Sequence, residues 1–310
     1  MIYALGESLL DIVWDGREPF DKGREITKNG IPGGAMLNAA VSLARSGMPV
    51  RLISELGEDA VAGFILEFLQ KNGVDTALVR QYPGLPTSVA IARLDEEKKP
   101  VYHFEKHYPE KRRLMPVQDL TPTDVLLFGS LYSLDNKVRP ELLKVLHAAR
   151  RAGSAIIYDP NIRQRKISPD GEAWNSVMEN IKLAHVVKAS DEDLMALFGA
   201  QSNQVLLNRL MDINPEVLAI MTRGKEGVLA YWKGEMIERP AKKVMVKSTV
   251  GAGDGFNAGF IYGWVHEKLN AQNLSELETV QVKVLLEYGV RFSAAVCGSL
   301  ENYIPESGPA

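Results

Sequence analysis

Cysteine is almost absent from this 310-residue chain, which contains only Cys297. A single thiol cannot form an internal disulfide, so the fold must be stabilised without one. The five histidines and this cysteine form no cluster with the spacing of a zinc site. A disulfide scaffold and a Cys/His zinc module are therefore excluded.

Long apolar runs and blocks of basic residues are also missing. No apolar stretch approaches the ~20 residues that a membrane-spanning helix needs. The segment Met1–Glu7 lacks the basic start of a signal peptide, so we expect a cytoplasmic protein. The net charge is −3, which argues against nucleic acid or an anionic membrane as a partner. A phosphate-bearing ligand would have to be held by local groups.

What the chain does contain is an ordinary globular balance of 45% hydrophobic and 24% charged residues. Short apolar runs alternate with amphipathic segments, which predicts a mostly parallel sheet with helices on both faces. No linker or repeat divides the pattern, so we expect one domain over residues 1–310. The predicted strands are Ile2–Leu5, Val50–Ser54, Asp124–Phe128, Ala155–Tyr158, His185–Val187 and Val217–Met221, with an edge hairpin of Gly227–Trp232 and Glu235–Arg239; the predicted helices are Ala35–Ser46, Asp59–Lys71, Arg139–Arg151, Glu172–Ile181 and Asp191–Phe198.

Two regions interrupt this alternation. Thr87–Leu94 and Val101–Lys106 alternate in polarity around a charged turn, which predicts a β-hairpin. Residues 12–31 are polar and carry little helical pattern. We expect the two regions, about 12–31 and 87–110, to form a small antiparallel β-lid on the main sheet. The alternative is a surface hairpin without a role.

The strongest chemical signal is the glycine-rich segment Ser248–Gly259, which leads into a predicted helix ending near His266. Gly251 and Gly253 leave backbone N–H groups bare at the helix start, where the helix dipole favours an anion. Asp254 would face that anion, and a carboxylate base beside a phosphate cradle is what phosphoryl transfer to a hydroxyl requires. The alternative is a turn that Asp254 merely caps. The spacing matches neither a dinucleotide fingerprint nor a Walker A loop.

A second pair of glycines, Gly33 and Gly34, opens the predicted helix that contains Asn38. Glycine lets a ligand approach the backbone closely, and the Asn38 amide can donate to and accept from a hydroxyl. Asp11 follows the first predicted strand, and ligands of open parallel sheets bind beyond the carboxyl ends of strands. We therefore expect Asp11 and Asn38 to meet as a polar pair that binds sugar hydroxyls. Tight helix–sheet packing at the glycines is the alternative.

A fourth segment, Asp159–Arg163, also follows a predicted strand. The planar guanidinium of Arg163 suits a phosphate group. The alternative is a turn formed by Asp-Pro-Asn and followed by a surface arginine.

Together these segments resemble the ribokinase-like, or phosphofructokinase-B, family of carbohydrate kinases over essentially the whole chain. The two specific motifs are Gly33–Ala40 and Thr249–Asp254. The resemblance implies a three-layer α/β/α sandwich with a mostly parallel central sheet and a small β-lid. It also implies transfer of the γ-phosphoryl group of ATP to a monosaccharide hydroxyl, with Mg²⁺ accompanying the ATP.

The same resemblance implies roles for individual residues. Asp254 would be the catalytic base, and Gly251, Ala252 and Gly253 would form the anion hole for the transferring phosphoryl group. The residues implied to bind the sugar are Asp11, Gly33, Gly34, Asn38, Asn161 and Arg163, and those implied to bind the nucleotide are Thr222, Gly224, Gly227, Ala294 and Val296.

Within the family, Gly129–Leu131 and Asp159–Arg163 look most like fructokinases, so fructose is the expected sugar. Ketodeoxygluconate kinase, ribokinase and nucleoside kinase activities stay open, as does a non-catalytic sugar or nucleotide sensor. The intact Gly-Ala-Gly-Asp sequence at residues 251–254 argues against the sensor, because a sensor needs no base. An exposed edge of the lid would also allow a homodimer.

Two positions depart from the family pattern. In the family, the late motif usually begins with an Asp that helps to hold a monovalent cation. Ser248 occupies that position here, so we expect activity to depend little on K⁺. Ser190–Asp193 replaces an Asn-x-x-Glu motif that organises Mg²⁺ through water. Asp193 keeps a carboxylate there and is the candidate for that role.

Overall fold

The centre of the molecule is a nine-stranded sheet with the order β13-β12-β11-β10-β9-β8-β1-β4-β5. The computed structural model describes residues 1–14, 30–94, 100–162 and 167–308. Neighbouring strands from β11 to β5 pair in parallel, and β12 and β13 add an antiparallel edge. The strands are β1 (Ile2–Leu5), β4 (Val50–Gly57), β5 (Asp75–Tyr82), β8 (Val125–Gly129), β9 (Ala155–Asp159), β10 (Val186–Ser190), β11 (Leu218–Thr222), β12 (Val228–Trp232) and β13 (Glu235–Arg239).

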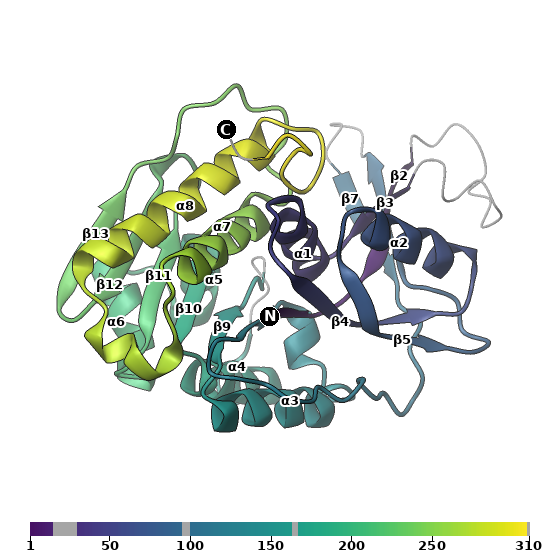
Figure 1. Cartoon of the computed structure of the whole chain (residues 1–310), viewed down its shortest axis with the longest axis horizontal. Helices are drawn as coiled ribbons and strands as arrows, with labels where there is room; N and C mark the ends of the chain where they lie inside the picture. Colours follow the sequence, from purple (N-terminus) through teal and green to yellow (C-terminus); the bar gives the residue numbers. More distant parts are fainter. Residues whose placement is uncertain (15–29, 95–99, 163–166, 309–310) are drawn as a thin grey trace.

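Helices cover both faces of this sheet, as Figure 1 shows. Parallel neighbours need a crossover between them, and the crossovers here are mostly helices. One face carries α1 (Ala35–Arg45), α2 (Ala60–Lys71), α7 (Ala252–His266) and α8 (Thr279–Cys297); the other carries α3 (Arg139–Ala152), α4 (Glu172–Leu183), α5 (Asp191–Phe198) and α6 (Asn203–Ile213). The short 3₁₀ turns are η2 (Leu131–Leu134), η3 (Gly224–Glu226) and η4 (Ala271–Glu276). Each face has its own apolar core, which confirms the predicted three-layer sandwich.

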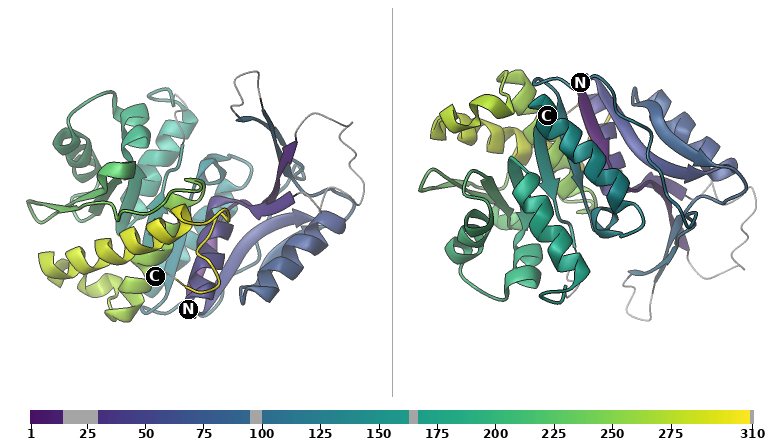
Figure 2. Two further views of the ribbon diagram at one scale, coloured as in Figure 1. Left: turned by 90° about the horizontal axis from the view of Figure 1, so that it is seen from above. Right: turned by 90° about the horizontal axis from the view of Figure 1, so that it is seen from below.

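A second sheet of four strands stands out from one end of the first, as Figure 2 shows. Its order is β3-β2-β6-β7, and β6 and β7 form the predicted antiparallel hairpin. Contrary to the expectation of a purely antiparallel lid, β2 pairs with β6 in parallel, because the two strands come from distant parts of the chain. The strands are β2 (Leu9–Trp14), β3 (Gly30–Gly33), β6 (Val89–Leu94) and β7 (Pro100–Glu105). The predicted hairpin tip at 95–99 and most of the predicted 12–31 segment lie outside the described residues.

The start of α2 ties this lid to the main body. Asp59 is the N-cap of α2, and its carboxylate accepts a hydrogen bond from the backbone N–H of Ala62. The same carboxylate accepts bonds from the backbone N–H and the hydroxyl of Thr87, just before β6, at 2.8 and 2.7 Å. The Asp59 side chain therefore both caps the start of α2 and positions the beginning of the lid hairpin.

Among the elements that were not predicted from the sequence are β5 and α6. β5 lies at the edge of the sheet and has only partly buried and exposed side chains, so it lacks the alternating polarity of a half-buried strand. α6 has Ser202 as its N-cap and buries Leu206, Leu207 and Leu210, a short pattern that does not separate a helix from a strand. Among the described residues, no helix is long and apolar enough to cross a membrane.

Candidate active site

The two glycine-rich motifs meet at the carboxyl ends of the parallel strands. The side-chain amide of Asn38 on α1 donates from Nδ2 to Oδ2 of Asp254 on α7 at 2.8 Å. The two residues are 216 positions apart in the chain and are 5% and 4% exposed. Since an ionised carboxylate only accepts, the contact also fixes which end of the Asn38 amide faces Asp254. A buried carboxylate with a fixed hydrogen-bond donor therefore sits in the first turn of α7.

The start of α7 is shaped by glycine. Gly251 is the N-cap, has a φ of 80° and makes no side-chain cap. A Cβ at this position would lie 2.0 Å from the carbonyl oxygen of Asn302, so only glycine fits the turn. The first N–H groups of α7 are left without a capping side chain, and such groups bind anions. The backbone N–H of Ala252 donates to the carbonyl oxygen of Thr249 at 3.2 Å, and the anion hole of Gly251, Ala252 and Gly253 stays a prediction.

The sugar-binding residues predicted near β2 and α1 also lie together. A Cβ on Gly33 would lie 2.1 Å from Oδ2 of Asp11, so the Asp11 carboxylate packs against the backbone of β3. Gly34 has a φ of 121°, and a Cβ there would lie 2.2 Å from the carbonyl oxygen of Glu7. Gly34 is also the residue from which α1 starts toward Asn38. The Gly pair thus brings Asp11 and Asn38 to the same end of α1.

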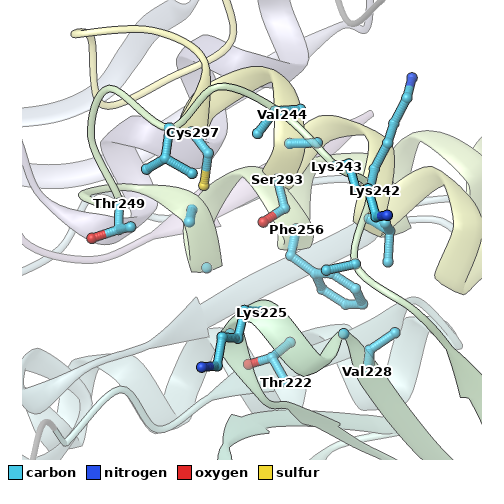
Figure 3. A pocket seen from close by; sticks show the side chains of 18 residues that line it. Thr222, Lys225, Val228, Lys242, Lys243, Val244, Thr249, Phe256, Ser293 and Cys297 are labelled. Carbon is cyan, nitrogen blue, oxygen red and sulfur yellow. The ribbon is translucent and has the colours of Figure 1, made fainter.

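A cavity of about 500 Å³ opens beside the start of α7. Thr222, Gly224, Gly227 and Ala294, all predicted nucleotide contacts, line it. Figure 3 shows Phe256, Ser293 and Cys297 along one wall and Thr222, Lys225 and Val228 along the opposite wall. The remaining lining residues are Ala241, Lys242, Lys243, Val244, Val246, Thr249, Ala252, Gly253 and Val290. Because Ala252 and Gly253 line the cavity, it adjoins the predicted anion hole.

Val296 does not line this cavity, which corrects one prediction. Its side chain is fully buried, and a Cβ on Gly255 would lie 2.7 Å from its Cγ2. Val296 therefore packs α8 against α7, and its neighbours Ser293 and Cys297 reach the cavity in its place. Helical periodicity explains this difference. Residues 293, 294 and 297 lie on one face of α8, and residue 296 lies outside that face.

The last residue of β9 supplies a buried carboxylate, so the predicted segment Asp159–Arg163 is more than a turn. Asp159 is 1% exposed, and its Oδ2 accepts bonds from Lys188 on β10 and Asn257 on α7. Asn161 has a φ of 41°, in the left-handed region that asparagine tolerates. Arg163 lies outside the described residues. Lys188 and Asn257 were missed from the sequence, although a lysine in the middle of an apolar strand is a signal that merits attention.

The two positions that depart from the family pattern both cap backbone turns. Asp193 and Ser190 form a capping box at the start of α5. Oδ2 of Asp193 accepts bonds from Ser190 in this capping box, and Oδ1 accepts from the backbone N–H of Ile162. Asp193 is 4% exposed. The Ser248 hydroxyl accepts from the backbone N–H of Val250 at 3.2 Å. Ser248 thus shapes the turn before Gly251 without bringing a charge.

Residues 4–305 match the pfkB family of carbohydrate kinases. A fructokinase of Klebsiella pneumoniae is 29% identical over 265 residues, which cover 84% of this chain and 83% of the relative. An aminoimidazole riboside kinase of Salmonella typhimurium is 27% identical over 264 residues, which cover 84% and 80%.

Solved structures share the fold of this chain. Fructokinase from Vibrio cholerae O395, with fructose, ADP and calcium ion bound, has a TM-score of 0.80 at 23% identity and covers 97% of this chain and 94% of its own. Aminoimidazole riboside kinase from Salmonella enterica, in complex with aminoimidazole riboside and an ATP analog, has a TM-score of 0.75 at 23% identity and covers 99% and 97%. The architecture is therefore the ribokinase-like sandwich.

The turn at Gly251 yields a prediction about stability. We expect Gly251→Ala to lower the free energy of unfolding by about 2–4 kcal/mol, because a left-handed backbone and a steric clash are both imposed. Gly47→Ala is the matched control: its φ of 82° is nearly the same, but no described heavy atom lies within 4 Å of a Cβ there. It should cost only about 1–2 kcal/mol. Urea denaturation measures both, and equal losses would contradict the role given to the Asn302 carbonyl.

Proposed function

Because this chain belongs to the pfkB family of carbohydrate kinases, we propose that it transfers the γ-phosphoryl group of ATP to a hydroxyl of fructose. The observation that carries the proposal is the hydrogen bond from Asn38 to Asp254 at the start of α7. It holds a buried carboxylate beside uncapped backbone N–H groups, with a cavity of nucleotide size next to them. Base, anion hole and donor cavity are then adjacent, which is the arrangement that phosphoryl transfer needs.

In this proposal the sugar lies between Asp11 and Asn38 with its reacting hydroxyl toward Asp254. Within the described part of the chain, Oδ1 of Asn38 is buried and has no hydrogen-bond partner. A buried unsatisfied acceptor is costly, so a donor from the ligand is expected there. A sugar hydroxyl that donates to Oδ1 would satisfy the amide while its neighbour faces Asp254.

The chemical step moves one proton and one phosphoryl group. Asp254 accepts the proton of the sugar hydroxyl, and the hydroxyl oxygen forms a bond to the γ-phosphorus. The bond from that phosphorus to the β–γ bridging oxygen breaks, and ADP leaves with the electron pair. The N–H groups of Gly251, Ala252 and Gly253 bind the equatorial oxygens, where negative charge concentrates during the transfer.

The cavity lined by Thr222, Gly224, Gly227 and Ala294 would hold ATP. Among residues 1–14, 30–94, 100–162 and 167–308, no three His, Cys, Asp or Glu side chains gather to hold a metal. Mg²⁺ commonly keeps its waters and binds through substrate phosphates, so it would arrive with the nucleotide. Asp193, whose oxygens accept bonds from Ser190 and Ile162, would act on the ion only through water.

The lid contributes the remaining contacts and an edge for assembly. In the lid sheet, Ile31, Asp11, Ala90 and Phe104 are paired in register, so they share one face. Ile31 and Phe104 are 40% and 41% exposed on either side of Asp11. This face would close over the sugar and exclude water. The lid-edge homodimer expected from the sequence stays a proposal, with β3 and β7 as the outer strands.

A panel of acceptors tests the proposed activity. With MgATP, fructose should give a kcat/KM at least tenfold above those of aminoimidazole riboside, ketodeoxygluconate, ribose and adenosine, as measured by ADP release. Aminoimidazole riboside is the first competitor, because a kinase for it is 27% identical to this chain. If another acceptor is preferred, the choice of fructose is wrong. If none is phosphorylated, the proposed activity fails.

Asp254→Asn should lower kcat by about 10²–10⁴-fold, because it removes the base and keeps the size of the side chain. ADP should still protect Cys297, which lines the cavity, from alkylation. The control is Asp212→Asn on α6, on the opposite face of the sheet and exposed to solvent, which should keep the wild-type kcat. A near-normal kcat in Asp254→Asn would contradict the role of catalytic base and would leave Asp254 only a structural role in α7.

We expect kcat/KM to change by less than about twofold when a bulky organic cation replaces K⁺ at constant ionic strength. With a carboxylate at position 248, the Coulomb attraction to a bound cation would be about 4 kcal/mol before desolvation, at an effective dielectric constant near 20. The Ser248 hydroxyl carries no charge and is bonded to Val250. Ser248→Asp should gain K⁺ stimulation. A tenfold loss in the wild type without K⁺ would show that carbonyl oxygens alone build a cation site.

A further inference from the structure

A buried ammonium group lies under the first turn of α7. Lys188 is in the middle of β10, paired with Ile220 of β11, and is 5% exposed. Residue 188 shares its face of the sheet with Val186, which packs in the core beneath α1, α7 and α8. The side chain therefore runs between the sheet and the helix that begins at the anion hole.

The ammonium has fewer acceptors than it has protons. Nζ of Lys188 donates to Oδ2 of Asp159 at 2.8 Å, and Nδ2 of Asn257 donates to the same oxygen at 2.6 Å. A lysine ammonium carries three N–H donors. Among the residues that the structure describes, Asp159 is the only acceptor within hydrogen-bond distance of Nζ. Two of its donors are thus available to a ligand.

The ammonium also lies close to Gly253. A Cβ added to Gly253 would lie 3.1 Å from Nζ of Lys188. Gly253 at the same time lines the cavity that leads to the start of α7. Since residue 253 has no side chain, no side-chain atom of this residue lies between the ammonium and an anion bound at its N–H. Lys188 itself does not line the cavity, and the lysines that do, Lys225, Lys242 and Lys243, are exposed to solvent.

The surroundings of Lys188 keep it charged. Burial alone would lower its pKa, but the charge and hydrogen bond of Asp159, followed by the charges of Asp193 and Asp254, outweigh burial and raise the pKa. The charges of three carboxylates thus act on one ammonium, and a phosphoryl group bound at Gly253 would add further negative charge. Without the ammonium, the carboxylates would repel that group, and only backbone N–H groups would oppose the repulsion in a region of low dielectric.

We propose that Lys188 is a further catalytic residue, whose ammonium donates to an oxygen of the phosphoryl group bound at Gly253 and offsets its charge during transfer. Asp159 and Asn257 position the ammonium and do not touch the phosphoryl group. Lys188 stays protonated throughout, so the proton and electron balance of the step is unchanged. The inference rests on the proposed function, because it takes the transferring group to lie at residues 251–253.

The test must separate this role from that of a buried ion pair that only stabilises the fold. Lys188→Met alone leaves Asp159 buried without a cation and is expected to fold poorly. The double variant Asp159→Asn/Lys188→Met removes both charges, and Asn257 can still donate to the amide oxygen introduced at position 159. We expect it to be folded, with Cys297 protected from alkylation by ADP at concentrations within about threefold of the wild type.

In the double variant we expect kcat for the accepted sugar to fall by about 10²–10³-fold, as for other lost anion-hole donors. Binding of ADP with aluminium fluoride and sugar, a mimic of the transferring group, should weaken at least tenfold while ADP alone binds as before. Asp159→Asn, which keeps the ammonium, should retain at least tenfold more activity than the double variant.

A double variant with kcat within threefold of the wild type would overturn the proposal, as would equal activities of the double variant and Asp159→Asn. These outcomes are distinct from failure of the proposed function, in which the wild type itself would phosphorylate no sugar. A double variant that also loses ADP protection of Cys297 would overturn the proposal too, because Lys188 would then support the whole cavity.

Discussion

The hydrogen bond between Asn38 and Asp254 is the contact on which the rest of the site depends. It joins the first helix of the chain to the helix that begins at the late glycine motif, and both start at the carboxyl ends of parallel strands. Because each helix starts at a glycine with a positive φ, Gly34 or Gly251, the backbone comes close enough for the two side chains to meet. In the proposed function, this pair joins the sugar side of the site to the phosphoryl side.

Beneath this pair the fold buries more charge than stability alone would favour. Asp159, Lys188 and Asp254 are each 5% exposed or less. Taking ions out of water is costly, and a buried ion pair seldom repays that cost in full. One oxygen of Asp159 and one of Asn38 lack partners among the described residues. These unsatisfied oxygens lie at the end of the sheet, near helix N–H groups that no side chain caps. Such groups are consistent with a site that binds a charged, hydroxylated ligand.

The donor cavity and the lid lie on two sides of the same helix start. Ala252 and Gly253 line the cavity, whereas Asp11 on the lid strand β2 packs against Gly33 near α1. The lid hairpin is anchored through Thr87 to the N-cap of α2. In the proposed function, closure over a sugar would involve the lid, while the proposed base and anion hole would stay fixed on the main sheet.

The sequence by itself determined the periodic strands and helices, the two glycine turns and the chemical groups that they expose, because these depend on local spacing and backbone sterics. It also carried the family resemblance that named Asp254 and the nucleotide residues. Only the tertiary structure decided that Asn38 bonds to Asp254, that Val296 packs inward, and that Lys188 lies under Gly253. Such contacts depend on strand order, helix rotation and burial, which bring together residues far apart in the chain and leave no local pattern.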